Sequence, residues 1–203
     1  MRHLVLLVEE PSMEAFLSTL LPRLLPADRT YEVHAFEGKR DLLSNLPVRL
    51  RGYRRWLPSD WRLVVLVDRD DGDCHQLKEC LENIAVESGL ITRTSAGGDP
   101  WQVVNRVVIE ELEAWYFGDW EAVREAYPRL PLTVSQKARY RIPDAIRGGT
   151  WEAFERIMQQ HGYFKTGLRK IEAARAVAAR IDVGRNRSRS FARFRDIVAE
   201  AST

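Results

Sequence analysis

Residues 62–73 read RLVVLVDRDDGD, an apolar and β-branched run that ends abruptly in acids. Residues 3–10 read HLVLLVEE and repeat the same pattern near the start of the chain. Apolar runs of this length, without polar alternation, are typical of strands that are buried on both faces of a parallel sheet. The two stretches therefore predict two central strands, each of which ends at acidic residues.

The segments around these runs alternate between strand and helix patterns. β-forming residues predict further strands at residues 30–36, 91–94 and 103–109. Apolar residues at helical spacing predict helices from residue 11, over 41–50, over 75–88 and from 110 or 111. This alternation implies an α/β fold with a mostly parallel sheet flanked by helices.

Beyond Asp119 the sequence changes character. Prolines punctuate it, and apolar residues recur at helical spacing in residues 151–158, 171–181 and 191–198. Two units are therefore expected. Residues 1–119 form an α/β domain, and residues 120–203 form a basic helical extension packed on it.

The composition indicates one real hydrophobic core. The 203 residues are 45% hydrophobic and 30% charged, which suits one domain with an appendage. No apolar run reaches the roughly eighteen residues of a membrane span, and acids follow the first apolar run too closely for a signal peptide. A cytoplasmic protein is expected. Cys74 and Cys80, even with His75, fall short of the four ligands of a structural zinc site.

The acids that follow the two apolar runs are the main candidates for chemistry. Ligands of parallel α/β sheets bind beyond the carboxyl ends of the strands, where we expect Glu9 and Asp68. Residues i and i+2 of an extended backbone point the same way, so Asp68 and Asp70 can face one cation. Crowded carboxylates favour Mg²⁺ or Mn²⁺, which can activate water for phosphoryl chemistry. A solvated acidic turn is the simpler alternative.

These motifs carry a resemblance to a known fold. A strand ending in Glu9 and a later strand ending in Asp68 and Asp70 resemble the TOPRIM fold. The local sequences resemble most the TOPRIM domains of overcoming-lysogenization-defect (OLD) nucleases and their small standalone relatives, which include a family of unknown function encoded beside ABC-type ATPases in bacterial defence loci. Glu10 stands where the family usually has glycine and adds a carboxylate. The resemblance covers residues 1–117.

The resemblance implies a function for residues 1–119 as a TOPRIM-like catalytic domain. Glu9, Asp68 and Asp70 would be both the catalytic residues and the ligands of Mg²⁺ or Mn²⁺ in a nuclease that hydrolyses phosphodiesters of DNA or RNA. An ABC-type ATPase would be its partner in anti-phage defence. Whether the chain forms a homodimer stays open.

Three further acids are candidate metal ligands, namely Asp73, Glu111 and Glu113. The sequence Glu-Leu-Glu-Ala at residues 111–114 resembles a signature of the same small family. If the strand predicted at 103–109 lies near the strand of Asp68, Glu111 and Glu113 emerge beside the metal and can hold a second ion. The alternative is that they are ordinary acids in the first turn of a helix.

Two basic segments are candidate contacts for nucleic acid. Arg54 and Arg55 lie among aromatic residues, as in surfaces that grip phosphates and stack unpaired bases. Such aromatic residues also commonly anchor a loop on the core. The last third of the chain is strongly basic and supplies further candidates: Lys170, Arg185, Arg187 and Arg189.

Residues 184–191 read GRNRSRSF and resemble the Asn-x-Ser-x-Ser-Phe close of the same small family. We expect Asn186 and Ser188 to order a turn that presents the arginines to phosphate, and Ser190 to cap the last helix. A solvated helix face is the alternative.

Two other functions stay open. In a phosphatase of the haloacid dehalogenase type, Asp68 would be the nucleophile and Asp70 the acid, but Glu9 would have no role. In a nucleic-acid-binding subunit without catalysis, the acidic residues would bind a metal only structurally or not at all.

Overall fold

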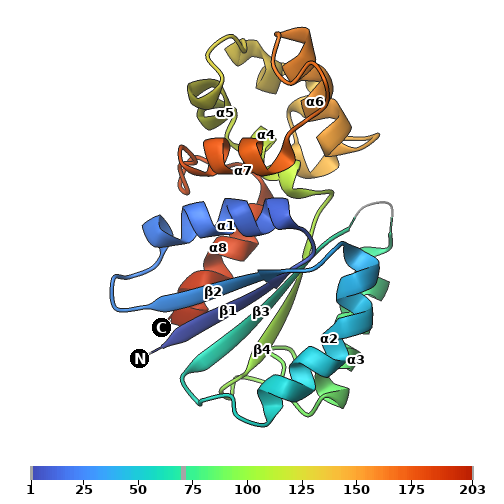
Figure 1. The fold of residues 1–203 in the computed structure, drawn as a ribbon, viewed down its shortest axis with the longest axis vertical. Helices are drawn as coiled ribbons and strands as arrows, with labels where there is room; N and C mark the ends of the chain where they lie inside the picture. The colour runs from blue at the N-terminus through green and yellow to red at the C-terminus, as the bar shows by residue number, and fades with distance from the viewer. Residues whose placement is uncertain (1, 70–71, 203) are drawn as a thin grey trace.

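The computed structural model describes residues 2–69 and 72–202 of the chain. Four parallel strands form one sheet in the order β2-β1-β3-β4, with β1 at His3–Val8, β2 at Thr30–Ala35, β3 at Trp61–Asp68 and β4 at Val103–Val108. Helices flank this sheet (Figure 1). The predicted α/β fold with a mostly parallel sheet is therefore confirmed.

The two central strands are buried on both faces, as their apolar runs predict. Leu4, Leu6 and Val8 of β1 lie in one hydrophobic cluster, whereas Val5 and Leu7 lie in another on the opposite face. Successive side chains of a strand point to opposite faces, so a strand without polar residues must be covered twice.

Two helices pack on each face of the sheet, and a further helix lies outside this layer on one face (Figure 1). Helices α2 (Lys39–Arg54) and α3 (Cys74–Glu87) pack on the face of Val5 and Leu7. Helices α1 (Pro11–Leu24) and α8 (Arg189–Ser202) pack on the other face, and α7 (Lys170–Ala178) lies along α1.

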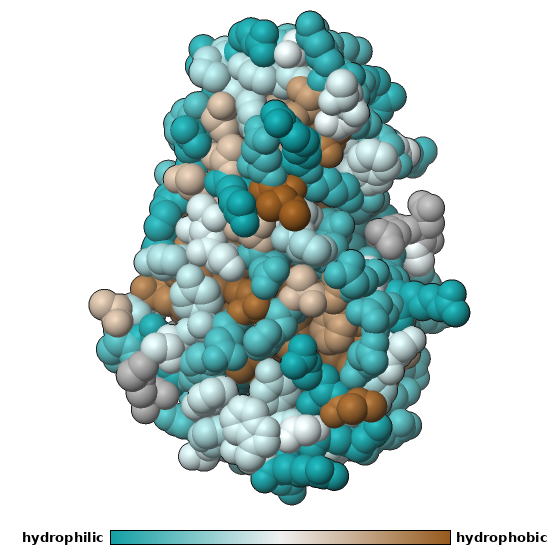
Figure 2. Space-filling model, in the orientation of Figure 1, coloured by the Kyte–Doolittle hydropathy of each residue, from teal (hydrophilic) through white to brown (hydrophobic). Residues whose placement is uncertain are grey.

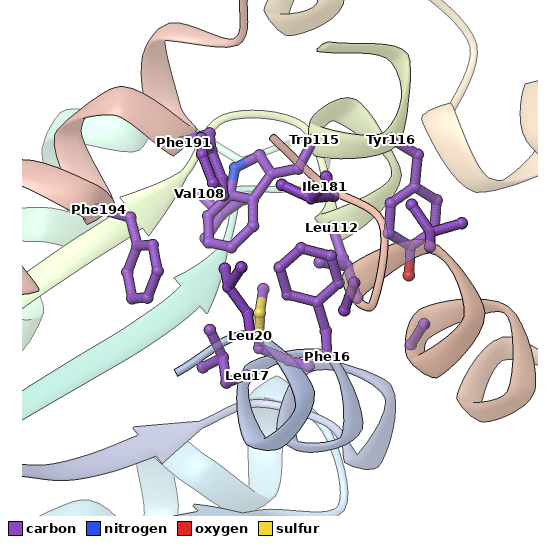
Figure 3. Packing of buried hydrophobic residues seen from close by; sticks show 14 of the residues in the cluster. Phe16, Leu17, Leu20, Val108, Leu112, Trp115, Tyr116, Ile181, Phe191 and Phe194 are labelled. Carbon is purple, nitrogen blue, oxygen red and sulfur yellow. The ribbon is translucent and has the colours of Figure 1, made fainter. Parts of the chain in front are cut away.

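The remaining elements lie beyond the carboxyl ends of the strands (Figure 1). They are α4 (Leu112–Gly118), α5 (Trp120–Ala126), three short 3-10 helices (Leu132–Gln136, Ala138–Tyr140 and Pro143–Ala145) and α6 (Thr150–Gln160). Trp115 of α4 links them to the sheet, because its ring packs on Phe16 of α1 and on Phe191 and Phe194 of α8 (Figure 3). The same hydrophobic cluster therefore contains residues from before and after Asp119.

Two elements differ from the sequence prediction. The helix expected at 41–50 extends over Lys39–Arg54, because Pro47 removes only one backbone donor while four apolar side chains of this helix are buried. The prediction of a strand at residues 91–94 is wrong. The expected strand is reduced to a single bridge between Thr92 and Val103, since the Thr92 nitrogen donates to Ser95 Oγ and the chain turns away.

The face shown in Figure 2 is mainly hydrophilic, with hydrophobic residues in small separate patches. Across the described residues, no helix combines the length and the apolar character needed to cross a membrane.

Candidate functional site

Glu9 and Asp68 meet at the carboxyl edge of the sheet. Strands β1 and β3 are neighbours in parallel register, with Val8 opposite Leu66. Glu9 follows β1 directly, and its Oε2 accepts a hydrogen bond from the backbone nitrogen of Asp68 at 3.0 Å. Asp68 is buried at the end of β3. The parallel register thus brings together two of the three acids that the sequence nominates as catalytic.

Asp70, the third nominated acid, lies outside the described residues together with Asp71. Among residues 2–69 and 72–202, no group of three or more acidic, histidine or cysteine side chains is arranged to hold a metal ion.

Glu113 is a buried carboxyl group near the same edge. Its side chain is 1% exposed, and its Oε2 has no hydrogen-bond partner among the described residues. Burial raises the pKa of Glu113 to about 8; Lys170 opposes the shift, whereas Glu10 and Glu111 add to it. A carboxyl with this pKa is mostly protonated and neutral at pH 7.

Lys170 lies among these acids, although the sequence nominated it for nucleic-acid contact. Its Nζ lies 3.4 Å from Glu10 Oε2 and 5.2 Å from the ring centre of Trp151. Burial alone would lower the pKa of Lys170, but the carboxylates of Glu113 and Glu10 outweigh it and raise the pKa. The start of α7 therefore brings one positive charge to the acidic edge.

Tyr116, which the sequence did not nominate, completes the buried part of this region. Its hydroxyl is buried without a hydrogen-bond partner among the described residues. Burial, followed by the charges of Glu113 and Glu10, raises the pKa of Tyr116 far above its ordinary value. The phenol therefore stays protonated and is an available donor. Only its position three residues after Glu113 in one helix could have suggested from the sequence that the two side chains lie near each other.

Glu111 joins two helices. Its Oε2 accepts hydrogen bonds from the Thr150 nitrogen and Thr150 Oγ1, both at 2.8 Å, and from the Trp151 nitrogen at 2.9 Å. These donors belong to the first turn of α6, whose free backbone nitrogens attract a carboxylate. Glu111 therefore caps a helix other than its own, and a role for Glu111 or Glu113 with a second ion stays a prediction.

Asp73 is the N-cap of α3. Its Oδ1 accepts hydrogen bonds from the nitrogens of His75 at 2.7 Å and Gln76 at 3.3 Å. These two bonds lower the pKa of Asp73, which is exposed. The geometry explains Asp73 as a capping residue, and its role as a metal ligand stays a prediction.

Arg54 and Arg55 do not lie at the acidic edge. They stand at the end of α2, which runs from the carboxyl end of β2 back to the start of β3. In a parallel sheet the starts of the strands lie at the opposite edge from their carboxyl ends. Both arginines are exposed there, so a substrate that contacts them and the acids must extend along the sheet.

The segment of Arg185, Arg187 and Arg189 is ordered largely as the sequence predicts. Asn186 Oδ1 accepts a hydrogen bond from the Ser188 nitrogen at 2.9 Å, which forms the expected turn. The cap of α8 differs. Ser188 Oγ accepts from the Phe191 nitrogen at 3.1 Å, whereas Ser190 Oγ faces inward and accepts from Trp115 Nε1.

The charges of this segment are partly neutralised. Arg185 Nε lies 2.7 Å from Asp119 Oδ1 and its Nη1 lies 2.8 Å from Glu121 Oε2. Asp119 is almost fully buried. Arg187 and Arg189 are exposed.

These features define a class of protein: an α/β protein with a fully parallel four-stranded sheet and acidic residues at the carboxyl edge of its two central strands. A family model described as "Domain of unknown function (DUF4276)" matches residues 8–199, and the chain belongs to this family. No curated protein and no solved structure matches the chain. The family description assigns no activity, so the function has to be argued from the site.

Proposed function

We propose that this protein is a TOPRIM-like, magnesium-dependent nuclease that hydrolyses phosphodiester bonds of DNA or RNA. One observation carries the proposal. The carboxylate of Glu9 and the end of the Asp68 strand meet at the carboxyl edge of a parallel sheet, with 3.0 Å between Glu9 Oε2 and the Asp68 nitrogen. This edge is where ligands of parallel α/β sheets bind.

The residues at this edge fit a divalent cation. Carboxylate oxygens are the donors that Mg²⁺ and Mn²⁺ prefer, and Glu9, Asp68 and Asp70 would hold the ion. The buried Glu113 Oε2, which lacks a hydrogen-bond partner among the described residues, is a further oxygen in the same region. When bound, such an ion polarises a phosphoryl oxygen and lowers the pKa of a water molecule.

The other side chains of this region would bind and orient the substrate. Lys170, 3.4 Å from Glu10, keeps a positive charge beside the acids and can attract a phosphate as a point charge. Glu10 holds that ammonium in place. This pairing also explains why a carboxylate at residue 10 does not simply add repulsion to the site.

The contact between Glu9 and Asp68 favours this function over a phosphatase of the haloacid dehalogenase type. Such a phosphatase would use Asp68 and Asp70 and leave Glu9 without a role. In this fold Glu9 binds the backbone of the residue that would be the nucleophile. We therefore keep hydrolysis of phosphodiesters as the proposal.

The resemblance to OLD-type TOPRIM domains supports a proposal for the biological role and the partner of this protein. We propose a cytoplasmic protein that acts on nucleic acid in anti-phage defence with an ABC-type ATPase as partner, and a homodimer remains one option for its assembly. These statements rest on the sequence resemblance alone, which the motifs at Glu9, Asp68 and Asp70 and at residues 111–114 and 184–191 carry.

The test is cleavage of labelled single-stranded and duplex DNA and RNA with Mg²⁺, Mn²⁺ or EDTA. Glu9→Gln and Asp68→Asn should abolish metal-dependent cleavage, whereas Glu79→Gln, an exposed acid on α3, should not. Mg²⁺ should also raise the unfolding temperature of the wild type, because a ligand of the folded state stabilises it, and should not raise that of Asp68→Asn. Cleavage that persists in EDTA or in Asp68→Asn would refute the proposal. Binding without cleavage would favour the nucleic-acid-binding subunit.

A further inference from the structure

A second site lies at the opposite end of α4 from Glu113. A pocket of about 600 Å³ opens between the start of α5, the 3-10 helix Leu132–Gln136 and the segment at residues 185–187. Three arginines line it: Arg141, Arg185 and Arg187. We propose that this pocket binds the terminal phosphate monoester of a nucleotide, and that Arg141 and Arg187 hold the phosphate.

Only one of the three arginines that line the pocket is paired with an acid of the pocket. Its two acidic lining residues, Asp119 and Glu121, both pair with Arg185. Within residues 2–69 and 72–202, neither Arg141 nor Arg187 forms an ion pair with an acid. Two guanidinium groups therefore remain to bind an anion, and their combined charge matches a phosphate dianion.

The segment that carries Arg187 is fixed in place before any ligand binds. The Arg187 nitrogen donates to Gly118 O at 3.0 Å, and Asn186 Nδ2 donates to Trp115 O at 2.9 Å. Asp182 Oδ1 accepts from the nitrogens of Gly184 and Arg185. A prearranged backbone reduces the entropy that binding would otherwise cost. Arg187 is therefore presented to the pocket from a fixed turn.

The opposite wall supplies the second guanidinium and an apolar surface. Arg141 Nη2 donates to Gln136 O at 3.4 Å, which steadies its side chain at the rim. Ser135 and Gln136 add neutral polar groups, and Leu132, which is 44% exposed, adds an apolar one. Arginine matches phosphate oxygens in a two-point fork. The volume falls within the range of about 300–1,000 Å³ that is usual for small-molecule sites and leaves room for the sugar and base.

Two sources share this chemistry: a free nucleoside monophosphate and the 5′-phosphorylated end of an oligonucleotide. The second would connect the pocket with the acidic edge, since Glu113 and the pocket-lining Gly118 lie on the same helix, α4. Gly118 follows Glu113 by five residues, which is about 7.5 Å along a helix. The proposal uses none of the acids at the carboxyl edge of the sheet and does not depend on the hydrolytic function.

Calorimetric titration in EDTA tests this site without any metal-dependent turnover. The ligands are AMP, adenosine, and one oligonucleotide with either a 5′-phosphate or a 5′-hydroxyl. AMP or the 5′-phosphorylated oligonucleotide should bind, whereas adenosine should not, and the 5′-hydroxyl form should bind more weakly than the phosphorylated one. Arg187→Gln and Arg141→Gln should each weaken binding by about tenfold to a hundredfold, as expected for loss of a charged hydrogen-bonding group.

Arg124→Gln is the matched control, because Arg124 is an exposed arginine of α5 that does not line the pocket. It should leave the affinity unchanged. If AMP binds more tightly than the 5′-phosphorylated oligonucleotide, the ligand is the free nucleotide. If the phosphorylated oligonucleotide binds and AMP does not, the ligand is a nucleic-acid end. The proposal is overturned if the 5′-phosphate makes no difference and AMP does not bind, or if Arg124→Gln weakens binding as much as Arg187→Gln.

Discussion

Glu9 Oε2 accepts a hydrogen bond from the Asp68 backbone nitrogen at 3.0 Å, although 59 residues separate the two in sequence. The bond joins the ends of β1 and β3 beyond their last paired residues. It satisfies a donor in a buried residue, and it fixes the direction of the Glu9 carboxylate. Glu9 therefore has a structural role that can be measured apart from any catalysis.

The loss of stability on replacing Glu9 should depend on whether the new side chain can accept the hydrogen bond from the Asp68 nitrogen. Glu9→Ala leaves the Asp68 nitrogen without its partner and should cost about 1–2 kcal/mol in the free energy of unfolding. Glu9→Gln keeps an oxygen acceptor and should cost less than half of that. Urea unfolding in EDTA measures both, with the exposed Glu79→Ala as control. Equal stability of Glu9→Ala and the wild type would contradict the structural role.

Glu113 should make the protein less stable as pH rises. Its pKa in the folded protein is raised to about 8 from an ordinary 4.5. The folded state therefore binds more protons than the unfolded state between these values, so its contribution is fully present below about pH 4.5 and is lost as pH rises through about 8. Each unit of pKa shift corresponds to about 1.4 kcal/mol, so the loss across that range is several kcal/mol.

Glu113→Gln tests this pH dependence, because glutamine is a neutral group of the same shape. Between about pH 4 and about pH 9, a range that contains both the ordinary and the raised pKa, the free energy of unfolding should fall more steeply for the wild type than for Glu113→Gln. The variant should be the more stable protein at the alkaline end. Parallel curves for the two proteins, measured in EDTA, would show that Glu113 does not titrate as its burial implies.

The sequence predicted the parts of the site that depend on regular strands. The uninterrupted apolar runs before Glu9 and Asp68 had to be central strands, and parallel strands place their ends at one edge. The contacts that residues 120–203 make with the site could not be predicted from strand patterns. Lys170 meets Glu10 across 160 residues, and Glu111 binds the first turn of α6. Neither pattern nor spacing encodes how α6 and α7 dock, because both depend on packing around Trp115, Tyr116 and Phe154.

Removing the carboxylate of Glu111 should loosen α6. Glu111→Ala leaves the nitrogens of Thr150 and Trp151 without their acceptor, and loss of such a cap costs about 1–2 kcal/mol. Hydrogen exchange should rise first in α6, and the free energy of unfolding should fall by a similar amount in EDTA. Glu125→Ala, an exposed acid on α5, should change neither. If Glu111→Ala lowers stability only when Mg²⁺ is present, a metal role would replace the capping role.

Gly118 should tolerate no side chain while Asn186 is present. A Cβ atom at Gly118 would lie 2.0 Å from Asn186 Oδ1 and 3.0 Å from the Ser188 nitrogen, so Gly118→Ala must displace the turn that presents Arg187. Forced overpacking of this kind costs about 1–3 kcal/mol. Asn186→Ala alone should also destabilise the protein, since it removes the bonds to Trp115 O and the Ser188 nitrogen. The double variant should lose less stability than the sum of the two single variants, because the alanine at 118 then occupies the space of the missing amide. If the losses of stability measured by thermal unfolding are additive, a side chain at residue 118 does not clash with Asn186, and the predicted coupling is wrong.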